Sequence, residues 1–305
     1  MNFIENVKSK YTAKRMNNIK QLYMSVNNER GAIKSNSSSP EIFAVNKKIS
    51  LRALPIMLSI GKNIEYNFKS LENNSIIPKT TASDNFIKEF ESYARSMGIV
   101  NMGYTKILPE LIFKDNAVLY ENAIILTKEI DKNQVDNELP GKSETDLKLY
   151  DKLGKITNEL ADYLRENGFG AHASHPAVGS VTYPTLAQQT GIGYRGKSNL
   201  LITPELGPRQ KISAIFTSID NLPLKEHNNH SWISDYCNTC GKCIKKCPEN
   251  AIVEIELNGT KSSKFIPELC RGCYESCTIC MKECPFNNRE YGQIKSRFEK
   301  NSRFL

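Results

Sequence analysis

Apolar residues recur at three- and four-residue steps in several segments of the chain, which is the pattern of an amphipathic helix. The strongest pattern covers residues 147–166, where leucine, isoleucine and tyrosine side chains fall on one side and Gly168 follows the end. Another covers residues 85–97, which Asp84 can cap. A shorter one covers residues 183–189. We expect three helices that pack one face against a core.

Short apolar runs between these helices predict buried strands. They cover residues 99–107, 122–127, 198–203 and 212–218. Helices that alternate with buried strands indicate an α/β (α+β) domain. We expect this domain over residues 81–230, because loop composition resumes just before that point.

The beginning of the chain has a weaker pattern. Residues 1–30 predict a basic amphipathic helix, which either packs on its own domain or lies on a membrane or RNA. Residues 41–80 predict no definite element. We therefore treat residues 1–80 as an N-terminal helical and irregular extension. The longest apolar run, at residues 49–60, is too short to span a bilayer.

Composition narrows the class of protein. The chain has 305 residues, of which 39% are hydrophobic and 24% charged, so it can fold as roughly two domains and is not disordered. The net charge of +8 permits an acidic partner but selects none. The first residues contain neither an apolar signal core nor a twin-arginine pair, and we expect a cytoplasmic location with no membrane span.

Cysteine spacing points to the chemistry. All nine cysteines fall in the window 237–284, and the first four are followed by a proline. The first run, Cys237, Cys240, Cys243 and Cys247, has the C-x2-C-x2-C-x3-C-P spacing of bacterial ferredoxins. In that motif three thiolates hold one cluster and the fourth serves another. Structural zinc, the alternative, usually pairs two cysteine knuckles across a longer gap.

A second run repeats the end of the motif. Cys277, Cys280 and Cys284 precede a proline, but Tyr274 occupies the usual place of the leading cysteine, so Cys270 or Cys273 must supply it. We predict Cys270, with Cys273 as the spare thiol. Cluster one would then use Cys237, Cys240, Cys243 and Cys284, and cluster two would use Cys247, Cys270, Cys277 and Cys280.

A hairpin is expected between the two cysteine runs. Its strands cover residues 252–257 and 261–266, joined by a type I′ turn at an Asn-Gly pair. The result is a double 4Fe–4S, ferredoxin-like domain over residues 231–290. Residues 291–305 form a basic tail, which we expect to be solvated, although it could contact RNA or an acidic electron donor.

A glycine-rich segment lies upstream. Gly191, Gly193 and Gly196 match G-x-G-x-x-G, but a predicted helix precedes them and a predicted strand follows. A dinucleotide-binding loop has the opposite order. We therefore interpret the segment as a loop that lets backbone approach a large planar ligand.

Residues 190–209, the segment 216–224 and the double cysteine motif together resemble the corrinoid-dependent reductive dehalogenases, whose core is shared by the epoxyqueuosine reductases of tRNA modification. The similarity extends over residues 86–287. It implies a base-off cobalamin in the α/β domain and two 4Fe–4S clusters that deliver electrons to cobalt. The cofactor-binding residues that it implies are Gly191, Gly193, Gly196, Ser198, His172 and His175.

The resemblance also implies catalytic roles for Tyr150, as a proton donor, and Lys197, whose charge would stabilise a developing anion. The alternatives are a core tyrosine and a solvated loop lysine. For His172 and His175, the alternative is a surface-loop position.

The chain departs from both named reactions. Residues 177–183 lack the carboxylate that epoxyqueuosine reductases carry before the helix leading to the glycine loop. We expect a reductase that receives electrons from a low-potential ferredoxin or flavodoxin and acts on a small organic molecule or a modified nucleoside. One alternative is a corrinoid-free electron-transfer protein that serves a partner enzyme. The other is tRNA modification of the epoxyqueuosine reductase kind, in which tRNA would bind.

Overall fold

A four-stranded antiparallel sheet lies at the centre of the computed structural model, which describes residues 26–27, 51–113, 116–137, 141–257, 260–272 and 277–302. The strands, in spatial order, are β2 (Asn101–Lys106), β4 (Asn122–Glu129), β8 (Gln210–Thr217) and β5 (Ala171–Ser174). All three pairings are antiparallel. The predicted alternation of helices and strands therefore folds as an α+β domain.

Each face of the sheet has its own core. Side chains alternate between the faces of a strand, so Ile124 and Leu126 of β4 face one core and Ala123 and Ile125 face the other. The first core is covered by α3 (Asp84–Ser96) and α5 (Lys142–Glu166), and the second by α6 (Tyr183–Gln189). All three predicted helices are confirmed, and Ser83 rather than Asp84 caps α3 by accepting a hydrogen bond from Phe86 N.

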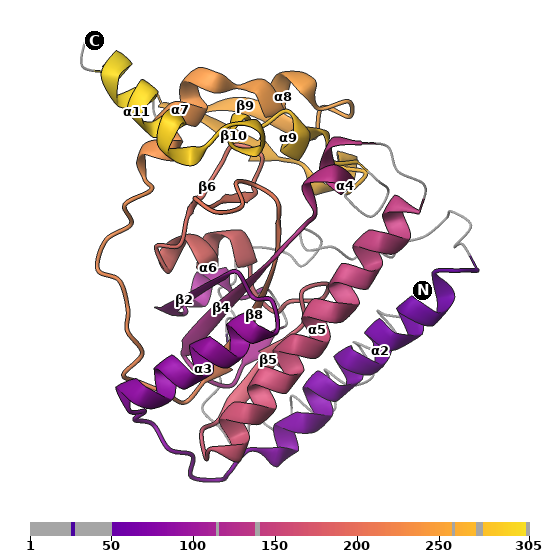
Figure 1. Ribbon diagram of the computed structural model, residues 1–305, viewed down its shortest axis with the longest axis vertical. Helices are drawn as coiled ribbons and strands as arrows, with labels where there is room; N and C mark the ends of the chain where they lie inside the picture. Colours follow the sequence, from indigo (N-terminus) through magenta and orange to yellow (C-terminus); the bar gives the residue numbers. More distant parts are fainter. Residues whose placement is uncertain are drawn as a thin grey trace.

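A helix that the apolar pattern did not predict runs alongside α5 (Figure 1). It is α2 (Leu54–Lys69), and its buried Met57, Ile60 and Ile64 share a core with Tyr150. Asparagines on the same face bond to α5: Asn63 donates to Asp151 at 2.7 Å, and Asn67 donates to Asn158. These polar residues at the contact with α5 obscured the helical periodicity of the segment.

Three short elements complete the α+β domain. β1 (Val26–Asn27) pairs with β3 (Ala117–Val118), so the predicted helix over residues 1–30 is wrong at residues 26–27, and its other residues lie outside those described. β6 (Tyr194–Arg195) pairs with β7 (Leu201–Ile202), which reduces the predicted strand at 198–203 to two residues. A short helix, α4 (Lys132–Asp136), follows β4.

The elements formed by residues 232–302, the part of the chain that contains the cysteines, gather at one end of the molecule, beyond the sheet (Figure 1). They are α7 (Trp232–Cys240), α8 (Lys242–Lys246), β9 (Ile252–Leu257), β10 (Thr260–Phe265), α9 (Ile279–Lys282), α10 (Pro285–Asn288) and α11 (Tyr291–Ser302). The β9–β10 pairing confirms the predicted hairpin, whose turn lies outside the described residues.

The end of the chain differs from the expected solvated tail. Residues 291–302 form helix α11, and Ile294 is buried in a cluster with Ile233 and Phe286. The helix is therefore packed onto α7 and α10, although its outer face is basic. Across the described ranges, no helix combines the length and apolarity that a bilayer crossing requires.

Candidate functional site

Four thiols from both cysteine runs line one pocket. Cys237 and Cys240 come from α7, Cys243 from α8, and Cys284 immediately precedes α10. These are the four ligands predicted for cluster one. Their number and type fit a 4Fe–4S cluster, which takes four thiolates.

Local backbone geometry brings these thiols to the pocket. Gly241 adopts a left-handed conformation with φ of 58°, which ends α7 and begins α8 between Cys240 and Cys243. Pro285 occupies the first turn of α10, where a missing N–H costs nothing. The sequence signature of the motif thus has a direct structural cause at both ends.

Burial makes the thiols of this pocket hard to ionise. It raises the pKa of Cys237 and Cys243 to about 11 and that of Cys284 to about 12, and neighbouring backbone N–H groups lower these values only partly. Thiolates are the form that binds metal. A cluster bound by these thiols would therefore displace their protons.

A second group of thiols contains Cys247, Cys270 and Cys277. Burial raises the pKa of Cys270, and the nearby Cys277 and Cys247 raise it further, while a hydrogen bond from Gly272 N at 3.4 Å lowers it. Cys280, the fourth predicted ligand of cluster two, packs beside Met281 in a separate small apolar cluster. Cys273 lies outside the described residues, so the choice of Cys270 stays a prediction that this grouping favours.

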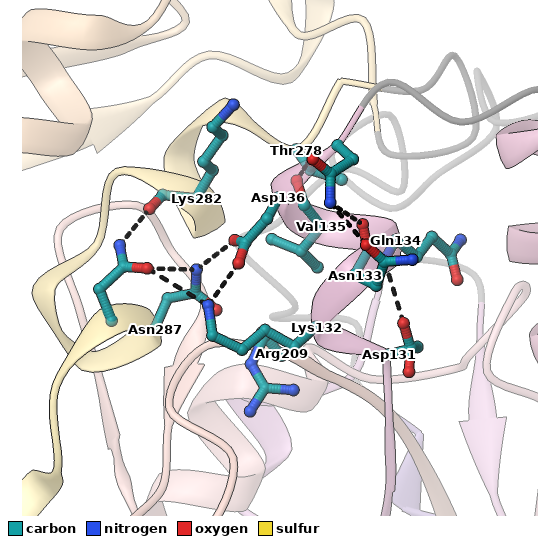
Figure 2. Close-up of polar contacts among 12 residues, drawn as sticks. Asp131, Lys132, Asn133, Gln134, Val135, Asp136, Arg209, Thr278, Lys282 and Asn287 are labelled. Atoms are coloured by element: carbon teal, nitrogen blue, oxygen red, sulfur yellow. Dashed lines mark hydrogen bonds and ion pairs between the residues drawn. The ribbon is translucent and has the colours of Figure 1, made fainter.

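Helix α4 ties the second cysteine run to the α+β domain. Figure 2 shows Asp136 of α4 facing Asn287, whose Nδ2 donates to its carboxylate at 2.7 Å. Thr278, next to Cys277, donates through Oγ1 to Val135 O at 2.8 Å. The buried Lys142, at the start of α5, donates to the same Oγ1 at 2.9 Å. The position of the second run therefore depends on contacts with residues far away in sequence.

The glycine loop packs on the chain itself. A Cβ on Gly193 would clash with the carbonyl oxygen of Ile202, and one on Gly196 would lie 2.8 Å from Ile202 Cδ1. Gly191 has a φ of +68°, beside Lys225. At Gly193 and Gly196, close approach to β7 explains the missing side chain, so the interpretation of these glycines as a cradle for a planar ligand gains no support from the geometry.

The end of this loop reaches the pocket of cluster one. Gly196, Lys197 and Ser198 line it together with the four thiols, and the nearby backbone N–H of Lys197 partly offsets the effect of burial, which raises the pKa of the Cys237 thiol. The Lys197 side chain is 6% exposed, so the alternative of a solvated loop charge is wrong. Lys197 and Ser198 therefore lie at the boundary between the α+β domain and the cysteine-bearing elements.

Tyr150 has a different lysine as its neighbour. Lys211 Nζ lies 4.0 Å from the centre of the Tyr150 ring, and Asp146 Oδ1 lies 2.8 Å from the same Nζ. All three residues are buried between α5 and β8. Sequence reasoning missed Lys211 and Asp146, although a lysine in an apolar strand and an aspartate one helical turn before Tyr150 were available signals.

His172 and His175 are buried, so the surface-loop alternative is wrong for both. Burial lowers the pKa of each imidazole to about 3, which keeps the rings neutral. Within the described part of the chain, His172 Nδ1 and His175 Nε2 have no hydrogen-bond partner. The His175 ring lies against Gly154 of α5, one turn beyond Tyr150, where a Cβ would clash with it.

Comparisons with known proteins find a 4Fe–4S domain and relatives that are reductases. Residues 230–253 match the family described as 4Fe–4S binding domain. The chain is 31% identical to the epoxyqueuosine reductase of Gloeobacter violaceus over 152 residues, which cover 45% of this chain and 46% of that protein. It is 32% identical to a tetrachloroethene reductive dehalogenase of Desulfitobacterium hafniense over 105 residues, which cover 34% of this chain and 18% of that protein.

A solved structure shares the fold. It is a reductive dehalogenase whose title describes B12-dependent dehalogenation, and it superposes with a TM-score of 0.64 at 17% identity over 92% of this chain and 44% of the other. The chain spans less than half the length of each relative named here. These findings confirm the resemblance to reductive dehalogenases and epoxyqueuosine reductases.

Proposed function

We propose that this chain is an iron–sulfur oxidoreductase that passes electrons through two 4Fe–4S clusters to an acceptor bound by the α+β domain. The observation that carries this proposal is the shared wall of one pocket. Cysteines of the ferredoxin-like elements and residues 196–198 of the α+β domain line it together. Cluster one would therefore lie next to the α+β domain and could pass electrons to it. Cluster two would receive electrons from a low-potential ferredoxin or flavodoxin.

Cobalamin is the acceptor that the similarity to reductive dehalogenases favours, and the chemistry of the buried residues fits it in part. His172 and His175 carry buried ring nitrogens that lack a partner among the described residues, and Tyr150 lies beside a lysine. These residues and Lys211 would line its site. When bound, the corrinoid would supply a strongly reducing centre for chemistry on a small organic molecule or a modified nucleoside.

Tyr150 is suited to supply a proton from its Oη. The positive charge of Lys211 at 4.0 Å from the ring would stabilise the phenolate left behind, and Asp146 holds Lys211 in that position. We therefore assign to Lys211 the stabilisation of a developing anion, which the family resemblance suggested for Lys197. The neighbours of Lys197 are instead the thiols of cluster one.

A second candidate function is an electron carrier without a corrinoid, whose α+β domain docks a partner enzyme. The close packing of Gly193 and Gly196 on β7 favours it, because those glycines leave no cradle for a planar ligand. The two candidates share the iron–sulfur clusters and differ in cobalt.

Metal analysis separates them. The protein would be reconstituted anaerobically with iron, sulfide and cobalamin, desalted, and assayed for both metals. About eight irons and about one cobalt per chain would support the corrinoid reductase. About eight irons without cobalt would leave the electron carrier, and the absence of iron would overturn both. As a control, Cys237→Ala should lose about four irons and leave the cobalt content unchanged.

A further inference from the structure

Lys197 is a buried cation in the wall of the cluster-one pocket. Its side chain is 6% exposed, and the residue lines the pocket together with the thiols of Cys237 and Cys243. A Cβ on the preceding residue, Gly196, would lie 3.6 Å from Cys237 Sγ, so this stretch of backbone runs close to that thiol. Lysine is rarely this buried unless it is paired. The burial of Lys197 therefore needs an explanation, and a cluster bound in the pocket would provide one.

The ion pair that Lys197 forms is loose. Glu254 Oε2 lies 3.5 Å from Lys197 Nζ, and the Glu254 side chain is 45% exposed. A charge-assisted hydrogen bond between such groups would be about 2.7–2.9 Å long. In the described ranges, Lys197 Nζ has no hydrogen-bond partner. Much of its positive charge is therefore left to act on the pocket, where low solvent exposure strengthens electrostatic interactions.

One hairpin holds Lys197 in this place. Glu254 lies on β9, and Ser263 on β10 donates through its Oγ to the carbonyl oxygen of Lys197 at 3.0 Å. The hairpin is the segment between the two cysteine runs. It thus contacts the lysine of the α+β domain through one side-chain contact and one backbone contact, and it does so beside the thiols of cluster one.

We propose that Lys197 raises the reduction potential of cluster one, that Glu254 offsets part of its charge, and that the contact from Ser263 holds its backbone in place. This inference rests on the proposed function, since it requires a cluster in the pocket. Reduction adds one electron to the cluster and no proton moves. A buried positive charge stabilises the more negative, reduced state, and net charge and hydrogen bonds to the sulfurs are known determinants of cluster potential. Cluster one would then accept electrons from cluster two more readily.

The test is a redox titration with dithionite, followed by electron paramagnetic resonance, on the reconstituted full chain. Lys197→Gln removes the charge and Lys197→Arg keeps it. We expect Lys197→Gln to move one of the two reduction steps to lower potential by at least a tenfold change in equilibrium constant, which is about 59 mV for one electron. The other step should stay in place, and Lys197→Arg should restore the shifted one.

Two further variants sharpen the result. Glu254→Gln removes the anion but leaves the backbone contact of Ser263, so it should move the same step in the opposite direction. Lys264→Gln removes an exposed lysine from the same hairpin and should change neither step.

The proposal would be wrong if Lys197→Gln kept its full iron content with both steps unchanged. It would also be wrong if Lys197→Gln lost about four irons, because the lysine would then serve cluster retention. A wild-type protein without iron would overturn the proposed function, and this inference with it.

Discussion

Lys211 Nζ lies 4.0 Å from the centre of the Tyr150 ring, and the carboxylate of Asp146 is its buried counter-ion at 2.8 Å. The three residues link α5 to β8 in the middle of the α+β domain. Breaking a buried ion pair by removing one partner leaves an uncompensated charge, which costs far more than the loss of an exposed pair.

Lys211→Met tests this arrangement. Because the Asp146 carboxylate would remain buried without its cation, we expect the free energy of unfolding to fall by about 3–5 kcal/mol. Denaturant titration followed by far-ultraviolet circular dichroism would measure it. The control is Lys155→Met on α5, the helix that carries Asp146. It breaks the pair with Asp151, in which the lysine side chain is 54% exposed, and should lower the free energy of unfolding by less than about 1 kcal/mol. Equal losses for the two variants would show that the buried pair has no special weight.

Gly207 provides a second test, at the contact between the α+β domain and α10. Its φ is +56°, and a Cβ there would collide with the carbonyl oxygen of Phe286, two residues after Cys284. Gly207→Ala should cost roughly 1–2 kcal/mol for the backbone conformation, and about 1–3 kcal/mol more for overpacking. The displaced α10 should also weaken retention of cluster one, measured as iron left after desalting.

The matched control for Gly207 is Gly292→Ala, near the start of α11. A Cβ at Gly292 would meet nothing within 4 Å, and its φ is not positive. Alanine is the better helix former, so we expect this variant to be neutral or stabilising by up to about 1 kcal/mol. If Gly207→Ala behaved like Gly292→Ala, the close approach of Phe286 would not constrain the fold.

The predicted cysteine groups depend on spacing alone, which is why sequence reasoning could reach them. Three ligands within seven residues must lie close together, and Pro285 begins α10 directly after Cys284. The grouping of Cys284 with the first run also follows from the motif. The same reasoning could not reach Lys142 or α4, because their contacts with Thr278 join residues more than a hundred positions apart.

Buried polar residues explain the other gaps between expectation and structure. Helix α2 escaped prediction because asparagines occupy part of its buried face, where they bond to α5. The positions of Lys197 and Lys211 could not be predicted for a related reason. A lysine is expected to be exposed, and only the folded structure shows that Lys211 lies beside Tyr150 and Lys197 beside the thiols.

The assignment of Cys270 gives a third prediction. Cys270 lies close enough to Cys247 and Cys277 for their charges to interact, so it should complete cluster two. We expect Cys270→Ala to bind about four irons per chain, and Cys273→Ala to bind about eight. Iron analysis after anaerobic reconstitution would distinguish them. The reverse outcome would make Cys273 the ligand and Cys270 the spare thiol.

The buried histidines give a fourth prediction, on the dependence of stability on pH. Burial lowers the pKa of His175 to about 3, although the charge of Asp151 opposes the shift, and burial and Arg165 lower that of His172 to about 3. An unfolded histidine has a pKa of about 6.5, so between these values the unfolded state binds more protons. The stability that the neutral rings provide is therefore complete above pH 6.5 and falls as the pH is lowered, by about 1.4 kcal/mol per pH unit for each histidine.

Denaturant titrations between about pH 7.5 and pH 5.5 would measure this loss, because the slope rises toward its full value across this window and each histidine contributes about 1.4 kcal/mol over it in total. His175→Gln removes one titrating ring, so its stability should fall less steeply with decreasing pH than that of the wild type, whatever its absolute stability. His227→Gln changes an exposed histidine and should leave the slope unchanged. Because the readout is the slope, a general loss of packing in His175→Gln does not imitate the effect. An unaltered slope in that variant would mean that His175 takes up its proton in the folded protein, and that the ring is not held neutral between β5 and α5.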